Sequence, residues 1–221
     1  LSPAQNPFET DPTVSYVSNS QGGLLIRDGK IFASGTNDEL KKRFKLAKIV
    51  DYGMKVIVPG FVDAHVHYPQ TSIIASWGKR LIDWLNDYTF PEEIKFHDPI
   101  YAKKIAETYL DLAICNGTTS LATYATIHPE SVDAIFKAAD SRGMSIVAGK
   151  TCMDRNAPNG LRDTAQSAYE DSKRLIETWH GKSRCIYAIT PRFAPTSSHE
   201  QLNALGQLWA EYPGCLMQTH I

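Results

Sequence analysis

The chain has 221 residues, of which 43% are hydrophobic, and this content is enough for a packed core and excludes intrinsic disorder of the whole chain. Lys and Arg number 23 against 24 Asp and Glu, so the formal net charge of -1 argues against nucleic acid or an anionic membrane as a partner. No apolar run approaches the roughly 18 residues of a spanning helix, and we expect a soluble, cytoplasmic protein.

The cysteines and the two ends of the chain lead to two further expectations. The four cysteines lie in apolar stretches without a CxxC pair, which predicts reduced, buried thiols at Cys115, Cys152, Cys185 and Cys215. The sequence starts without an initiator Met and stops inside an apolar run. We therefore expect a fragment, or one segment of a longer chain.

Residues 1–58 carry the turn signals of short antiparallel strands. Residues 24–27 and 30–33 flank Asp28-Gly29, which is a strong hairpin signal. The basic residues 41–43 could bind an anion, but in a short amphipathic helix a solvated face is the more common outcome. We predict that residues 1–58 form part of a small N-terminal β-sandwich domain.

From residue 56 onward, short apolar runs alternate with amphipathic helices, as in parallel sheets built with right-handed crossovers. The expected strands are 56–67, 118–125, 145–152, 185–193 and 215–221. Four helices are expected between them. The first covers 98–116, the second extends from Pro129 to Gly143, and the third extends from Ala165 to Gly181. The fourth begins at a cap on Ser197 or Ser198 and ends at Pro213-Gly214.

The fold class that this pattern predicts is α/β. The period of about 33 residues suits a (β/α)₈ barrel, of which about five strands fall in residues 59–221. A doubly wound sheet has the same local pattern, so periodicity does not choose between the two. No GxGxxG or GxxxxGK[ST] motif follows a strand, which removes the usual nucleotide-binding fingerprints.

His65 and His67 are candidate metal ligands. Residues two apart on a strand point to the same side, so both imidazoles face one point while Val66 faces away. Two neutral imidazoles form half of a site for Zn²⁺ or a similar ion, and ligands bind at the carboxyl ends of barrel strands. Such a pair also occurs by chance on half-exposed strands. The spacing alone therefore favours a metal site and a structural role about equally.

His220 lies at the end of the last expected strand. A single histidine on a strand is usually structural, but this location would face the same mouth of a barrel as the first pair. Three histidines leave room for further ligands and a water molecule, as in catalytic metal sites. The remaining histidines lie at helix edges or in loops, where capping or exposure accounts for them: His97, His128, His180 and His199.

Several segments together resemble a known family. Residues 59–67 are similar to the metal-binding signature of the amidohydrolase superfamily, and the wider set resembles its guanine deaminases: 67–70, 84–85, 88–92, 116–119, 149–154 and 190–193. The resemblance covers residues 22–221. It implies an incomplete amidohydrolase barrel that takes part in deaminating guanine to xanthine and ammonia in purine catabolism, as a homodimer with one Zn²⁺ or iron ion per subunit.

The resemblance also assigns roles to six residues. It makes His65, His67 and His220 metal ligands, and Gln70, Arg192 and Phe193 substrate-binding residues. Guanine offers O6 and N7 as acceptors, which a guanidinium and an amide donor can satisfy, whereas adenine would oppose its 6-amino group to Arg192. A surface salt bridge is the plain alternative for Arg192, and a turn residue for Gln70.

The implied reaction needs water activated by the metal to attack C2, with carboxylates moving protons. The resemblance places that Glu and Asp, and a fourth histidine, beyond Ile221, so no catalytic residue is expected within the chain. Lys150 falls on the third strand rather than the fourth, which favours one metal over two. Two alternatives stay open: a mononuclear deaminase of a related heterocycle, and a non-catalytic binding protein on this scaffold.

Overall fold

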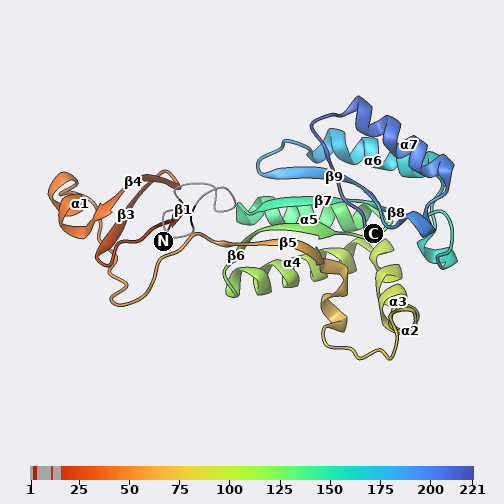
Figure 1. Cartoon of the computed structure of the whole chain (residues 1–221), viewed down its shortest axis with the longest axis horizontal. Helices are drawn as coiled ribbons and strands as arrows, with labels where there is room; N and C mark the ends of the chain where they lie inside the picture. The colour runs from red at the N-terminus through yellow and green to blue at the C-terminus, as the bar shows by residue number, and fades with distance from the viewer. Residues whose placement is uncertain (1, 4–10, 12–15) are drawn as a thin grey trace. The chain divides into compact units, whose positions relative to one another are not determined.

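The computed structural model describes residues 2–3, 11 and 16–221, which fall into two compact units, Leu1–Pro59 and Gly60–Ile221. Figure 1 shows the elements of both units along the chain. Within the described residues, no helix has both the length and the apolar character needed to cross a membrane.

The described residues of the first unit form two strand pairs and one short helix: β1 (Ser2–Pro3), β2 (Tyr16–Val17), β3 (Gly22–Arg27), β4 (Lys30–Thr36) and α1 (Asn37–Arg43). Both pairs, β1 with β2 and β3 with β4, are antiparallel, and the predicted hairpin is confirmed. Its turn holds Asp28 and Gly29 at φ of 51° and 70°, in the left-handed region that Gly and Asp tolerate best.

The basic residues 41–43 at the end of α1 are exposed, as expected of a solvated face. Residues 1, 4–10 and 12–15 of the predicted N-terminal domain lie outside the described residues. The assignment of 1–58 to a β-sandwich stays a prediction.

The second unit alternates strands and helices. Its strands are β5 (Phe61–His67), β6 (Thr118–Tyr124), β7 (Ser145–Gly149), β8 (Thr151–Cys152), β9 (Cys185–Pro191) and β10 (Leu216–Met217). Its long helices are α4 (Pro99–Cys115), α5 (Pro129–Arg142), α6 (Ala165–Trp179) and α7 (His199–Glu211). Shorter helical segments are η1 (Tyr68–Ile73), α2 (Leu81–Trp84), η2 (Leu85–Thr89), α3 (Phe90–Ile94), η3 (Lys95–His97), η4 (Asn159–Leu161) and η5 (Ala194–Thr196).

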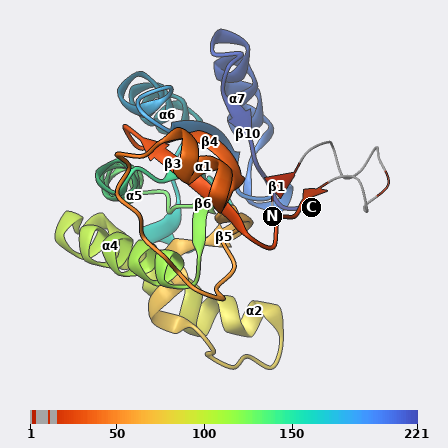
Figure 2. The ribbon, with the colours of Figure 1, turned by 90° about the vertical axis from the view of Figure 1, so that its left-hand side faces the viewer.

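The sheet of the second unit is parallel, with the order β10-β9-β7-β6-β5, and β8 also pairs with β9. The order follows the chain without the reversal that marks a doubly wound sheet, so these are successive strands of a barrel. Helices α4, α5, α6 and α7 follow one another in an arc on one side of the strands (Figure 2).

The sheet is strongly curled. In a flat sheet of five strands spaced about 4.8 Å apart, the edge strands β5 and β10 would be about 19 Å apart. Yet Nε2 of His67, at the end of β5, lies 3.1 Å from Nε2 of His220, which follows β10. The curvature therefore brings the carboxyl ends of the two edge strands to one place.

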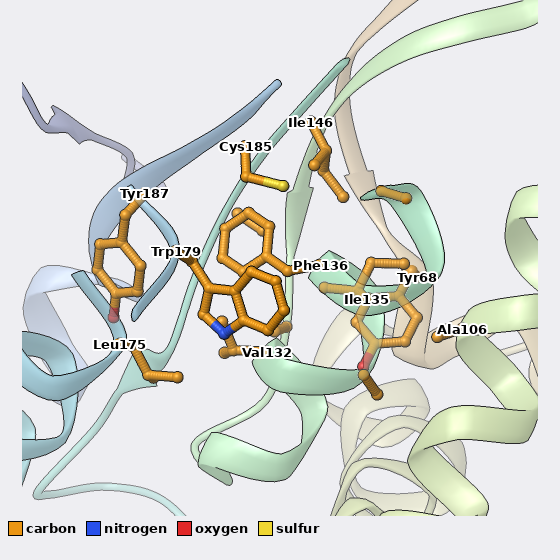
Figure 3. Packing of buried hydrophobic residues seen from close by; sticks show 14 of the residues in the cluster. Tyr68, Ala106, Val132, Ile135, Phe136, Ile146, Leu175, Trp179, Cys185 and Tyr187 are labelled. Atoms are coloured by element: carbon orange, nitrogen blue, oxygen red, sulfur yellow. The ribbon is translucent and has the colours of Figure 1, made fainter. Parts of the chain in front are cut away.

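The main core lies between the sheet and the long helices (Figure 3). The apolar faces of α5 and α6 supply buried members of it: Val132, Ile135, Phe136, Ala139, Ala168, Leu175, Ile176 and Trp179. The rings of Phe136 and Trp179 stack with their centroids 5.6 Å apart. On β9, Cys185 and Tyr187 face this core, while alternation turns Ile186 to the other side, where it is exposed.

The bounds of the expected strands need correction. The strand expected over 145–152 is interrupted at Lys150, and those expected over 118–125 and 185–193 end at Tyr124 and Pro191. The first barrel strand begins at Phe61 rather than at residue 56, because Pro59 has no N–H for a ladder hydrogen bond. The strand expected over 215–221 contains only Leu216–Met217, and His220 pairs further on through an isolated bridge to Phe193.

One burial expectation on α4 is also wrong. Cys115 is exposed, whereas the other three cysteines are buried, and all four are free. On α4 the buried core residues end at Leu110, and of the later residues only the partly buried Ala113 packs against the core.

Candidate metal and substrate site

His65, His67 and His220 converge at the carboxyl ends of β5 and β10. One ring nitrogen of each lies within 4.8 Å of those of the other two. His65 and His67 share one side of β5 because they are two positions apart on the strand, with one residue, Val66, between them. The structure thus brings together all three histidines that the sequence singles out.

The orientation of His220 is fixed by the backbone of Arg192. Nδ1 of His220 lies 2.8 Å from the carbonyl oxygen of Arg192. A carbonyl oxygen can only accept, so Nδ1 carries the proton and Nε2 keeps its lone pair for the cluster. The backbone N–H of His220 donates to the same oxygen at 3.0 Å, which also holds the main chain of His220 in place.

The cluster favours neutral imidazoles. Burial lowers the pKa of His67 to about 3, and the charges of Arg192, His220 and His65 act in the same direction. Burial also lowers the pKa of His220. Neutral imidazole is the form that ligates metal ions, so these nitrogens are ready to do so at neutral pH.

Tyr124, the last residue of β6, supports the cluster from one side and was missed in the sequence. Its ring stacks on His67 with centroids 4.6 Å apart and lies 4.4 Å from the ring of His220. The side chain is buried, burial raises its pKa to about 12, and its hydroxyl has no hydrogen-bond partner among the described residues. Its place at the carboxyl end of an expected strand was the one available signal.

The three histidines fit a transition-metal ion. A tetrahedral site with Zn–N distances of about 2.0–2.1 Å has its nitrogens about 3.3 Å apart. His67 and His220 are already at 3.1 Å, and His65 is exposed and within reach. Three nitrogen donors suit Zn²⁺ or Fe²⁺ better than Mg²⁺ or Ca²⁺, which prefer oxygen. The bond from His220 to a carbonyl is the usual outer support of a ligating histidine.

Arg192 and Gln70 meet at Glu93, a residue of α3 that the sequence analysis missed. Nη1 of Arg192 donates to Oε2 of Glu93 at 2.5 Å, and Nη2 donates to Oε1 at 3.2 Å. Nε2 of Gln70 lies 3.5 Å from the same Oε1. Both Glu93 and Arg192 are buried, so the surface salt bridge considered for Arg192 is wrong.

Phe193 and an open cavity complete the surroundings. Phe193 pairs with His220 through the isolated bridge, and its side chain is exposed. A cavity of about 350 Å³ is lined by His67, Gln70 and Trp84 among others, and its volume is at the lower end of that of ligand pockets. Arg192 and Phe193 do not line it, so Gln70 is the one predicted substrate residue on its wall.

Other candidate groups stay apart from the histidine cluster. Lys150 follows β7, the third barrel strand, as expected. Its side chain is buried and forms an ion pair with Asp163. The four remaining histidines occupy the helix edges and loops expected of them: His97, His128, His180 and His199.

A curled parallel sheet with imidazoles at its carboxyl edge is the architecture of a metal-dependent hydrolase barrel. Residues 56–221 match the amidohydrolase family, and the chain belongs to this family. The expected resemblance to that superfamily is confirmed.

Relatives within the family are guanine deaminases. The guanine deaminase of Escherichia coli (strain K12) is 44% identical over 217 residues, covering 98% of this chain and 49% of that protein. A probable guanine deaminase of Deinococcus radiodurans is 36% identical, covering 91% of this chain and 47% of that protein. A crystal structure of guanine deaminase from C. acetobutylicum with bound guanine superposes with a TM-score of 0.80 at 35% identity, covering 90% of this chain and 47% of that one. The chain spans about half the length of the curated relatives it matches.

Proposed function

We propose that the protein containing this chain is a guanine deaminase, which hydrolyses guanine to xanthine and ammonia in purine catabolism. One observation carries the proposal: Arg192 joins the histidine cluster to a buried, polar recognition site, through its carbonyl oxygen on one side and its guanidinium on the other. Similarity to the guanine deaminases of other organisms supports the same activity.

The histidines would hold one Zn²⁺ or iron ion per subunit. Bound there, the ion supplies the Lewis acidity that makes water a nucleophile for ring carbon C2 near neutral pH. His220 is held for this role by the carbonyl of Arg192, and Tyr124 packs against the ring of His67 and restricts its rotation.

Substrate recognition falls to Arg192, Gln70 and Phe193. A guanidinium has five N–H groups, and the pair with Glu93 uses two of those on Arg192, so three remain for the acceptors O6 and N7 of guanine. Adenine presents an amino group at position 6, which would leave two donors opposed without an acceptor. Phe193 follows Arg192 directly, pairs with His220 through an isolated bridge, and has an exposed side chain.

The remaining parts of the proposal rest on the resemblance and on composition. The carboxylates that move protons are expected in the protein after Ile221. The homodimer is proposed from the resemblance, and the cytoplasmic location from cysteines without a CxxC pair. The formal net charge of -1 supports the absence of a nucleic-acid or membrane partner. Residues 1–58 are assigned to part of a β-sandwich domain and 59–221 to the first part of the barrel.

The experiment is metal analysis of the intact protein together with product analysis on guanine. We expect about one zinc or iron per subunit, equal amounts of xanthine and ammonia, and loss of turnover on chelation that added Zn²⁺ restores. A protein without bound metal that forms no xanthine contradicts the proposal. Turnover of a pterin or triazine with none of guanine would instead support the alternative deaminase.

A further inference from the structure

We propose that Glu93 is a positioning residue that orients both base-reading side chains, Arg192 and Gln70, and thereby selects a purine with an oxo group at position 6. The inference rests on the proposed function, because it names the residue that organises the same substrate site.

Glu93 reaches both side chains with one carboxylate. Its Oε2 accepts from Arg192, and its Oε1 accepts from Arg192 and lies 3.5 Å from Nε2 of Gln70. Arg192 is 99 residues away in the sequence and Gln70 is 23 residues away, so Glu93 ties the end of β9 to the segment after β5. Glu93 is 1% exposed and Arg192 is 8% exposed, and little water competes for these bonds.

The bidentate pair fixes the plane of the Arg192 guanidinium. The N–H groups that do not face Glu93 then point in set directions, away from the carboxylate. The ring of Phe90, also on α3, lies 5.7 Å from Cζ of Arg192 and restricts the guanidinium further. An oxo group can accept from these fixed donors, whereas an amino group in the same place cannot.

The same carboxylate determines which end of the Gln70 amide is free. A carboxylate has no hydrogen to donate, so the NH₂ group of Gln70 faces Glu93 and its carbonyl oxygen faces away. Gln70 also lines the cavity beside His67. The carbonyl oxygen can accept from N1–H or the 2-amino group of guanine. Glu93 thus changes the part predicted for Gln70 from a donor to an acceptor.

Glu92 provides a matched control on the same helix. It is also buried, it forms an ion pair with Lys95 at 2.6 Å, and it accepts from the hydroxyl of Tyr101. Its hydrogen bonds reach neither Arg192 nor Gln70. Substitution of Glu92 therefore removes a buried carboxylate from α3 without changing the two base-reading side chains.

The test compares Glu93→Gln with Glu92→Gln in the intact protein. We measure kcat and KM for guanine, the Kd of xanthine by calorimetry, and bound metal. For Glu93→Gln we expect unchanged metal content, with KM and the xanthine Kd raised by about tenfold or more, the scale of one lost charge-assisted hydrogen bond. For Glu92→Gln we expect the KM and Kd of the parent protein. In an Arg192→Met background, Glu93→Gln should raise the Kd by a smaller factor, because its main partner is gone.

Glu93→Asp serves as the second variant, since it keeps the charge and shortens the side chain. Its KM should lie between those of the parent and Glu93→Gln, and if Glu93→Gln does not fold, a raised KM in folded Glu93→Asp supports the inference. A parent-like KM and Kd in the folded Glu93 variant overturns it, as does an equal loss in Glu92→Gln. A parent protein that does not deaminate guanine overturns the proposed function and this inference with it, whereas an active parent with unaffected variants overturns the inference alone.

Discussion

Arg192 holds His220 through its main chain and not through its side chain. The carbonyl oxygen of Arg192 accepts from Nδ1 of His220 at 2.8 Å and from its backbone N–H at 3.0 Å, while the guanidinium pairs with Glu93. Replacing the side chain of Arg192 does not remove its carbonyl oxygen, so the two hydrogen bonds from His220 can still form. The proposed metal site and the proposed recognition site can therefore be tested separately.

Arg192→Ala should keep the metal and lose the preference for guanine. We expect kcat/KM for guanine to fall by about 100-fold or more, which corresponds to about 2.7 kcal/mol. The free energy of unfolding should also fall, by about 3–5 kcal/mol, because Glu93 is left buried and unpaired. Kinetics with guanine and adenine, metal analysis and urea unfolding measure the three effects. Unchanged discrimination between the two purines would refute the role of Arg192.

His65→Ala should remove metal and activity together. The three ring nitrogens lie within 4.8 Å of one another, so loss of one leaves only two donors. Metal affinity should fall by more than the roughly 10–100-fold that loss of an outer supporting group costs. The measurement is metal content after dialysis, alongside xanthine formation. A variant that turns over guanine at the parent rate would show that the metal lies elsewhere.

Lys150→Met tests the expectation of a single metal. Lys150 is buried and pairs with Asp163, which also accepts from Nε2 of Gln201 at 2.7 Å. The substitution should lower the free energy of unfolding by about 3–5 kcal/mol, since a buried carboxylate loses its cation. Adding Asp163→Asn should recover part of that loss. Metal content per folded subunit should not change, and a fall in it would point to a bridging lysine.

Gly149→Ala should strongly destabilise the sheet. A Cβ at Gly149 would lie 1.7 Å from the carbonyl oxygen of Ala188, a backbone atom of the neighbouring β9. We expect a loss of about 3 kcal/mol or more in urea unfolding. Gly206→Ala is the control, because nothing lies within 4 Å of the added carbon on α7. It should stabilise the protein by about 0.5–1 kcal/mol, and equal effects of the two changes would contradict the packing described for β7 and β9.

Alkylation should distinguish Cys115 from the other cysteines of the chain. Burial raises the pKa of Cys152 to about 12 and the pKa of Cys185 and Cys215 to about 11, whereas Cys115 is exposed. The thiolate is the reactive form, so a raised pKa and poor access both slow the reaction. Peptide mapping after brief iodoacetamide treatment should show the label on Cys115 first. Early labelling of Cys152 would contradict its burial, and Cys115→Ser should remove the fast phase.

Local patterns in the sequence were enough to predict the strands and helices of the barrel and the three histidines of the site. The spacing of His65 and His67 and the Gly143 stop after α5 depend on periods and caps within a few residues. Glu93 could not be found that way, because its partner Arg192 is 99 residues distant and no local period connects them. Tyr124 was missed for the same reason: its value lies in contacts with rings from other strands.

The two edges of the sheet meet at His67 and His220, which are 153 residues apart in the chain. Every intervening strand must be paired, and the sheet must be curled, before these nitrogens come within 3.1 Å. Contacts between residues so far apart in the sequence form late in folding. The conformational entropy of the intervening loop must be lost before the contact contributes any stabilising free energy. A metal ion held by these histidines, as proposed, would therefore bind only after the strands from β5 to β10 are assembled. We expect such an ion to slow unfolding more than it speeds folding.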